Sequence, residues 1–346
     1  MTNINSQKSI WKGSNGPLLI AEIGGNHEGN FEKAKMYTKL AIESGVDCIK
    51  FQLYRGDTLV NAIENPQRNK HFKKFELSKE ENIYLAEMCK KANIIYNASV
   101  WDIEMLNWID PYLDFYKVGS GDMTAWPIIR EFAIRNKPIL LSTGLSTMNE
   151  VIETVDYIQS ININYCDPSM LCIMQCTSMY PIPNSEANLS VMNKFKNLTG
   201  LSVGYSDHTI GIEALKIASA MGANVLEFHF TDSREGKKFR DHKVSLTVDE
   251  VKLLSQQINK ITEFLGDGEK KLQKSEIQNN HNISFRRGVY LNKKIKKGSF
   301  ISFSDLVFLR PNHGTHSKDY NLIVGAKALK DLFPLEPITE NVHYKK

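Results

Sequence analysis

The chain has 346 residues, of which 42% are hydrophobic and 24% charged, and its formal net charge at pH 7 is +4. These fractions are ordinary for a globular protein, so they exclude a disordered chain and allow one large domain plus a small one. The densest basic run, Lys293-Lys294 with Lys296-Lys297, has no interleaved aromatic residues, so we expect a solvated face and no nucleic-acid partner. The sequence also shows no signal-peptide pattern, no apolar stretch of membrane-spanning length and no CxxC spacing among its five cysteines. We therefore expect a cytoplasmic protein with reduced thiols and no membrane partner.

Short apolar runs alternate with helical patterns through most of the chain. The first run, 18–23, ends at Gly24-Gly25 and is typical of a strand buried on both faces. Further strands are predicted at 46–53, 94–99, 115–119, 139–142, 171–176, 201–205 and 225–230. Helices are predicted within 26–45, near 79–92, after Trp101, at 127–135, 148–158 and 187–195, between the last two strands, and at 248–265.

Eight strand–helix units in about 250 residues predict an α/β protein, a (β/α)8 TIM barrel. A doubly wound open sheet is the alternative. It is less favoured because polar residues recur at the ends of nearly all eight strands, and only a closed barrel gathers eight strand ends around one centre.

The C-terminal part of the chain changes character after the last predicted helix. Residues 266–284 are polar and charged and are predicted to form a linker between the barrel, 1–265, and a small domain, 285–346. Short strands are predicted there at 288–291 and 300–301, separated by turns at Lys297-Gly298 and Pro311-Asn312. The domain is small for an independent core, so we expect it to pack on another surface.

Two histidines mark the last two strands of the predicted barrel. His208 and His229 lie near the ends of neighbouring parallel strands, so both imidazoles reach the same face. Two neutral imidazoles form half of a divalent metal site with open positions for substrate. A hydrogen-bonding role in a loop is the alternative for each histidine alone. Their pairing, with Asp207, Glu227 and Asp241 close in sequence, favours metal binding or catalysis.

Two lysines inside strand runs, Lys50 and Lys117, predict an anion pocket, because a buried ammonium group without a partner is costly. Hydroxyl groups at neighbouring strand ends would add donors for a phosphate or carboxylate. The carboxylates Glu22, Asp122 and Asp241 are candidate acid–base groups or partners of the histidines. The combination predicts an enzyme that acts on a small anion and a carbonyl or hydroxyl compound, with the metal as Lewis acid. The sequence contains neither a P-loop nor a GxSxG elbow.

Eight motifs in one order carry a resemblance that extends over nearly the whole chain. They are AEIGGNHEGN, IKFQ, YKVGSGD, ILLSTG, CTSMYPIP, GYSDHT, EFHFTD and DHKVSL. This order resembles the sialic acid synthase family, which comprises the nonulosonic acid synthases. The later segments SFRRGVYLNKKIKKGSFIS and LRPNHG resemble the antifreeze-like (SAF) domain, a β-clip module, that completes those enzymes.

The resemblance implies a transferase that condenses phosphoenolpyruvate with an N-acetylated hexosamine, typically N-acetylmannosamine, and releases phosphate by C–O cleavage. It implies a divalent metal, Mn²⁺ or Mg²⁺, held by His208 and His229, and a homodimer with swapped SAF domains. Catalysis would fall to Glu22, Asp122 and the two histidines. Phosphoenolpyruvate would be bound by Lys50, Gln52, Ser99, Lys117, Ser120, Ser142, Ser178 and Ser206, and the sugar by Tyr180, Asp241 and Arg310.

Two positions depart from the family pattern and leave the sugar open. Phe228 stands where a basic residue is expected, and Asp122 where Glu is usual in the N-acetylneuraminate enzymes. Legionaminic or pseudaminic acid synthesis from a 2,4-diacetamido-trideoxyhexose is therefore an alternative. More distant alternatives are a non-catalytic carbohydrate-binding barrel and a metal-dependent aldolase that takes pyruvate as donor.

Overall fold

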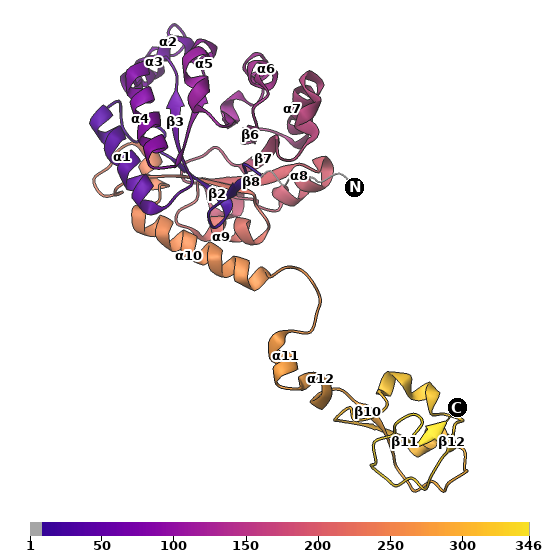
Figure 1. Ribbon diagram of the computed structural model, residues 1–346. Helices are drawn as coiled ribbons and strands as arrows, with labels where there is room; N and C mark the ends of the chain where they lie inside the picture. Colours follow the sequence, from indigo (N-terminus) through magenta and orange to yellow (C-terminus); the bar gives the residue numbers. More distant parts are fainter. Residues whose placement is uncertain (1–8, 346) are drawn as a thin grey trace. The chain divides into compact units, whose positions relative to one another are not determined.

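The computed structural model describes residues 9–345, and the chain divides after Gly266 into two compact units (Figure 1). The first unit is built on eight parallel strands. They are β2 (Gly16–Glu22), β3 (Cys48–Leu53), β4 (Ile95–Val100), β5 (Tyr116–Val118), β6 (Ile139–Ser142), β7 (Leu171–Cys176), β8 (Ser202–Asp207) and β9 (Val225–His229). A short strand, β1 (Lys12–Gly13), pairs with β2 in the antiparallel sense.

The first and last of these eight strands are hydrogen-bonded to each other, which closes the sheet between β2 and β9. No backbone ladder joins β4 and β5 in the described part of the chain, but the side-chain amide of Asn97 donates to the carbonyl of Phe115 at 2.7 Å. The first unit is thus a nearly closed (β/α)8 barrel. This confirms the predicted TIM barrel and excludes the open sheet.

An outer layer of helices covers the barrel. These helices are α1 (Phe31–Ser44), α4 (Lys79–Lys91), α5 (Ile103–Ile109), α6 (Trp126–Arg135), α7 (Met148–Ile161), α8 (Val191–Thr199), α9 (Glu213–Ala220) and α10 (Val248–Leu265). Capping boxes led by Ser78, Thr147 and Thr247 satisfy the free amides that begin α4, α7 and α10. In α10, Val251, Leu254 and Ile258 form the buried stripe that a 3.6-residue period requires.

Two helices between β3 and α4 were not predicted. They are α2 (Gly56–Leu59) and α3 (Pro66–Phe75), and α3 begins with the side chain of Asn65 capping Arg68 and with Pro66 in its first turn. Most of the residues in α3 are polar, so the helix lacks the apolar period on which the prediction depended. In addition, α8 begins at Val191, four residues later than predicted, because Asn188 has a left-handed backbone conformation (φ 44°) and residues 189–190 form a turn.

The second unit has its own small core, which includes Val289, Leu291, Ile301, Ile323 and Tyr344. It contains the antiparallel pairs β10 (Gly288–Leu291) with β11 (Leu306–Leu309) and β12 (Lys327–Ala328) with β13 (Tyr344–Lys345). The predicted strand at 300–301 is wrong, because Phe300 is exposed and forms only one bridge, to Lys327. Two short helices, α11 (Lys274–Gln278) and α12 (His281–Ser284), lie in the segment predicted as a linker. Between residues 9 and 345, no helix combines the length and the apolar character that crossing a bilayer requires.

Candidate active site at the carboxyl end of the barrel

The alternation of side chains along each strand builds the site. In β2, Leu18 and Ile20 point into the barrel and join an apolar plug that also contains Trp11, Cys48 and Phe115. The next inward position of β2 after Ile20 is Glu22, because side chains alternate with a period of two. The same step leads from Cys48 to Lys50 in β3 and, two strands further around the barrel, from Phe115 to Lys117 in β5. The barrel interior therefore changes from apolar to charged toward the carboxyl ends of its strands, where TIM-barrel active sites lie.

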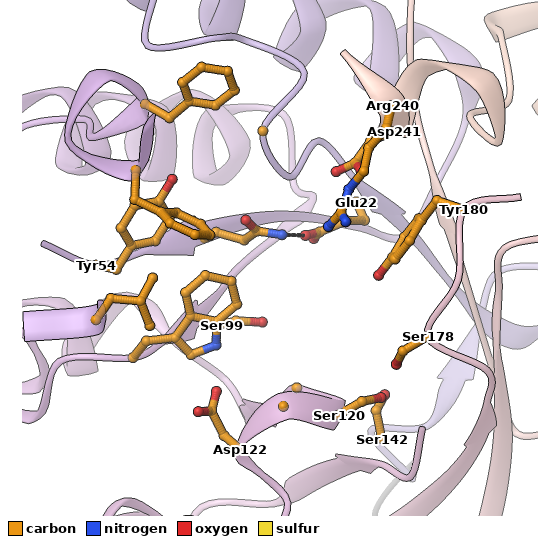
Figure 2. Close-up of a pocket in the computed structure, with 18 of the residues that line it drawn as sticks. Glu22, Tyr54, Ser99, Ser120, Asp122, Ser142, Ser178, Tyr180, Arg240 and Asp241 are labelled. Atoms are coloured by element: carbon orange, nitrogen blue, oxygen red, sulfur yellow. Dashed lines mark hydrogen bonds and ion pairs between the residues drawn. The ribbon is translucent and has the colours of Figure 1, made fainter. Parts of the chain in front are cut away.

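A pocket of about 1000 Å³ opens at this end (Figure 2). It is lined by every predicted site residue of the first unit. These are Glu22, Lys50, Gln52, Ser99, Lys117, Ser120, Asp122, Ser142, Ser178, Tyr180, Ser206, His208, His229 and Asp241. Arg310 lies in the second unit, directly after β11.

Two lysines and two glutamates form the floor of the pocket. Lys50 Nζ lies 2.5 Å from Glu22 Oε2 and 3.8 Å from Glu227 Oε2, and Lys117 Nζ lies 3.7 Å from Glu227 Oε1. All four side chains are less than a tenth exposed. Because solvent reaches so little of these side chains, the charges must largely compensate one another.

The pKa values of the two glutamates shift in opposite directions, although both side chains are buried. Burial raises the pKa of Glu22, although Lys50 opposes the shift. It acts in the same direction on Glu227, but Lys117 and Lys50 outweigh it and lower the pKa of Glu227. Burial opposes the charge on both lysines as well; the glutamates overcome it at Lys50 and raise that pKa, whereas the pKa of Lys117 is lowered. Glu22 is thus the more easily protonated carboxyl group, and its protonation would leave the floor with excess positive charge for an anion.

Hydroxyl groups surround the two ammonium groups. Lys117 donates to Ser142 Oγ at 2.6 Å, Lys50 donates to Ser99 Oγ at 3.3 Å, and Ser206 donates to Glu227 at 3.1 Å. At the neighbouring strand end, the Gly144 amide donates to Ser120 Oγ at 3.0 Å. Ammonium groups, hydroxyls and a backbone amide in one buried cluster form a set of donors suited to phosphate or carboxylate oxygens.

The two predicted metal ligands lie together. The rings of His208 and His229 have centroids 5.3 Å apart, and the ring of Tyr180 lies 4.0 Å from that of His208. His208 Nδ1 is 2.7 Å from the carbonyl oxygen of Thr177, so Nδ1 carries the proton and Nε2 keeps a free lone pair. Burial lowers the pKa of His229 to about 4, so this imidazole is neutral, and its buried Nδ1 has no hydrogen-bond partner.

These properties fit a divalent cation held by two imidazoles, provided that His208 gives up its second proton: burial lowers the pKa of His208, but Cys176 and the Thr177 carbonyl outweigh burial and raise it. Within residues 9–345, no group of three or more His, Cys, Asp or Glu residues has the arrangement of a metal site. Substrate and water would therefore have to supply the remaining ligands. Asp241 Oδ2 lies 3.8 Å from His229 Nδ1 and suits the role of its partner.

Several residues that line the pocket were not predicted. Cys176, one of the five cysteines expected to be reduced, has its sulfur 3.9 Å from His208 Nδ1. An aromatic wall comes from Tyr54, Trp101 and Phe72, and Arg240 lies over the ring of Tyr180 at 4.6 Å. Trp101 follows the end of β4 directly, so extending the strand-end rule by one residue would have found it.

Phe228 does not face the pocket. It is 1% exposed and packs in the core between the strands and the outer helices, because its neighbours Glu227 and His229 take the inward positions of β9. The absence of a basic residue at this position therefore removes no charge from the pocket. Of the two departures noted in the sequence, only Asp122 changes the pocket lining.

A barrel whose carboxyl end gathers buried lysines, hydroxyls and paired imidazoles belongs to the class of TIM-barrel enzymes that act on small anions. Comparisons with known proteins define the family. The NeuB family model matches residues 37–270, and the SAF domain model matches residues 286–341. The chain belongs to the NeuB family of phosphoenolpyruvate-dependent nonulosonic acid synthases, which are condensing enzymes of the transferase type.

Individual relatives align over nearly the full chain. The N,N'-diacetyllegionaminic acid synthase of Campylobacter jejuni is 35% identical over 93% of this chain and 99% of its own. The N-acetylneuraminate-9-phosphate synthase of Homo sapiens is 30% identical over 97% and 96%. Among solved structures, the N-acetylneuraminic acid synthetase of Leptospira borgpetersenii, in complex with citrate, is 28% identical and has a TM-score of 0.71 over 78% of this chain and 92% of its own.

Proposed function

We propose that the enzyme condenses phosphoenolpyruvate with the open-chain form of an N-acetylated amino sugar, giving a nine-carbon 2-keto acid and phosphate. The observation that carries the proposal is the pair of buried lysines, Lys50 and Lys117, in one pocket with His208 and His229. A simple carbohydrate binder has no need for two buried ammonium groups, because sugars are neutral. A pyruvate-dependent aldolase would not need a pocket floor with so many hydrogen-bond donors suited to a phosphate group.

In this proposal the phosphate and carboxylate of phosphoenolpyruvate take the lysine and hydroxyl donors. Lys117 with Ser142 and Lys50 with Ser99 supply the charged donors, and the Gly144 amide lies beside them. Gln52, Ser120, Ser178 and Ser206 complete the predicted contacts. Fixed donors of this kind orient the enol and stabilise the charge that develops on its oxygens.

The condensation forms one C–C bond and breaks one C–O bond. C3 of phosphoenolpyruvate attacks the aldehyde carbon, C2 becomes cationic, and a water oxygen adds there while a carboxylate accepts one water proton. That proton passes to the former aldehyde oxygen, which becomes a hydroxyl group, and the second water proton leaves with the phosphate. Collapse of the resulting C2 adduct breaks its bond to the bridging oxygen, which leaves with phosphate. Glu22 and Asp122 are the candidate carboxylates, and Glu22 already accepts a hydrogen bond from Gln52 at 2.9 Å.

We propose that His208 and His229 hold the divalent cation that the family resemblance implies, Mn²⁺ or Mg²⁺. When bound, such a cation supplies Lewis acidity toward the aldehyde oxygen. The neighbouring residues orient the two histidines. The Thr177 carbonyl fixes the tautomer of His208, and Asp241 lies beside His229 Nδ1. Tyr180 packs on His208 and limits the space open to the sugar.

We also propose a homodimer in which each SAF domain closes the pocket of the other barrel, with Arg310 of the partner subunit at the sugar's N-acetyl group. This rests on the family resemblance and on the SAF match alone. Because phosphoenolpyruvate is a cytoplasmic metabolite, we place the reaction in the cytoplasm.

Two classes of sugar are candidates for the second substrate, N-acetylmannosamine and a 2,4-diacetamido-trideoxyhexose. The sequence analysis put N-acetylmannosamine first, but two relatives at 35% and 33% identity are N,N'-diacetyllegionaminic acid synthases, whereas the human N-acetylneuraminate-9-phosphate synthase is 30% identical. These identities support the 2,4-diacetamido-trideoxyhexose alternative.

The proposed function is tested by phosphate release from phosphoenolpyruvate in the presence of Mn²⁺, with each sugar offered separately. Release with at least one sugar, lost in His208→Ala, supports it; silence with every sugar from folded protein overturns it. Phosphoenolpyruvate labelled with ¹⁸O at the bridging oxygen tests the bond cleavage, because only C–O cleavage carries that label into the phosphate.

A further inference from the structure

The carboxylate of Asp241 is buried and depends on its neighbour in the chain. The Asp241 side chain is 6% exposed, and among the described residues only Arg240 donates a hydrogen bond to it, from Nε to Oδ1 at 3.1 Å. The other oxygen, Oδ2, is the one that lies 3.8 Å from His229 Nδ1. A buried carboxylate needs a donor or a cation beside it, so the contact with Arg240 fixes the carboxylate with Oδ2 toward the imidazole.

The same guanidinium group lies over the ring of Tyr180. The guanidinium carbon of Arg240 is 4.6 Å from the centroid of this ring, which is the distance at which a cation is attracted to the face of an aromatic ring. The Tyr180 ring in turn lies 4.0 Å from the ring of His208 and 5.5 Å from that of His229. Arg240 therefore contacts two side chains that each adjoin a histidine of the candidate metal site.

The backbone that carries Arg240 is anchored on both sides. The residue before it, Phe239, packs on Phe75 of α3 with ring centroids 5.1 Å apart. After it, the buried hydroxyl group of Ser245 donates to the carbonyl oxygen of Asp241 at 2.7 Å. The side chain of Arg240 is 66% exposed, but it starts from a fixed point and makes two contacts at its charged end.

We infer that Arg240 is a positioning residue for the sugar: it holds Tyr180 and Asp241 at the places where each meets a histidine. Figure 2 shows these three side chains together on one wall of the pocket, with Ser120 and Ser142 across from them. The inference rests on the proposed function, in which Tyr180 and Asp241 contact the sugar while the serines contact phosphoenolpyruvate. Loss of Arg240 should therefore weaken the binding of the sugar and spare that of phosphoenolpyruvate.

A direct role as an anion donor is the alternative for an arginine that lines the pocket. The charge of Arg240 is already paired with Asp241, whereas the ammonium groups of Lys50 and Lys117 lie among the hydroxyls of the pocket floor. The two roles also predict different results. A positioning residue changes the KM for the sugar, and an anion donor changes the KM for phosphoenolpyruvate.

The test measures phosphate release by the Mn²⁺-loaded enzyme and gives kcat and a separate KM for each substrate. The sugar is N-acetylmannosamine or 2,4-diacetamido-2,4,6-trideoxymannose, whichever the wild-type enzyme uses. Arg240→Met keeps the length of the side chain and removes its charge and donors, and Arg240→Lys restores a cation. Arg130→Met is the matched control, because Arg130 on α6 is similarly exposed, at 57%, and does not line the pocket.

We expect Arg240→Met to raise the KM for the sugar about fivefold, the value of one hydrogen bond, and to change the KM for phosphoenolpyruvate less than twofold. Arg240→Lys should raise the KM for the sugar only about twofold, because an ammonium group still pairs with Asp241 but cannot lie flat on the Tyr180 ring as well. In both variants kcat should fall less than the KM for the sugar rises, and Arg130→Met should behave as wild type.

Several results would overturn the inference and leave the proposed function standing. An unchanged KM for the sugar in Arg240→Met would remove the positioning role, and an equal rise in both constants would indicate a general loosening of the pocket. A rise in the KM for phosphoenolpyruvate alone would make Arg240 an anion donor, and a complete loss of kcat would make it a catalytic residue. The absence of phosphate release by the wild-type enzyme with either sugar would instead reject the proposed function itself.

Discussion

Glu22 and Lys50 occupy paired positions on neighbouring strands, and their charged atoms lie 2.5 Å apart in the floor of the pocket. Each side chain is 4% exposed. In such surroundings a single charge is poorly solvated, so each of these groups depends on the other. We therefore expect the pair to contribute to stability as well as to the proposed substrate binding, and the two contributions can be separated by mutation.

We expect Lys50→Met to lower the free energy of unfolding by about 3–5 kcal/mol, because it leaves Glu22 buried without its cation. The same variant should lose phosphate release, since it lacks the ammonium group that we propose to bind phosphoenolpyruvate. Urea unfolding and the phosphate assay measure the two effects.

The double variant Lys50→Met/Glu22→Gln is the control for this interpretation. It removes both charges, so most of the lost stability should return while activity stays absent. A double variant as unstable as Lys50→Met would show that the lost pairing with Glu22 does not cause the instability.

Asp122 should make the stability of the protein depend on pH. Burial raises its pKa from 3.8 to about 6, and Lys117 opposes the shift only in part. The folded protein therefore holds this proton more tightly than the unfolded chain does. The protonated carboxyl group is tolerated below pH 4, and stability is lost as the pH rises toward 6.

Asp122→Asn removes this titration, so we expect the variant to be more stable than wild type above pH 6, by up to about 3 kcal/mol. The difference should shrink steadily as the pH falls toward 4. Chemical unfolding at pH 7.5, 6 and 4.5 measures it, and a difference that is constant over this range would contradict the prediction. The same variant separates the two candidate carboxylates, because kcat should fall more in whichever of Asp122→Asn and Glu22→Gln removes the group that accepts the water proton.

Gly144 marks a point where the backbone comes close to the hydroxyls of Ser120 and Ser178, which we propose to bind phosphoenolpyruvate. A Cβ atom there would lie 2.4 Å from Ser178 Oγ and 2.8 Å from Ser120 Oγ. We expect Gly144→Ala to displace both hydroxyls and to raise the KM for phosphoenolpyruvate about tenfold, the value of one lost charge-assisted hydrogen bond. The KM for the sugar should change little, and an equal rise in both constants would argue against a local effect at the anion.

The period-two pattern of the strands made much of the site predictable. Once a strand is placed, Glu22, Lys50 and Lys117 follow as the inward residues beyond the apolar plug, and the eight strand–helix units fix which ends meet. The segment with α2 and α3 was not predictable in this way, because α3 is polar around most of its circumference. Contacts between different strand ends and loops, such as Arg240 over Tyr180 or Cys176 beside His208, join residues far apart in the sequence and depend on the register of the folded sheet.

The two imidazoles give a prediction that does not depend on turnover. If His208 and His229 bind Mn²⁺, the ion should stabilise the folded protein by about 2.7 kcal/mol at one hundred times its Kd, which is seen as a rise in Tm. His208→Ala should lose this rise, because one of only two protein ligands is gone, whereas His316→Ala in the second unit should keep it. A chelator should return the wild-type Tm to its metal-free value and abolish phosphate release. An Mn²⁺-dependent rise in Tm that persists in His208→Ala would place the ion elsewhere and remove the two-histidine assignment.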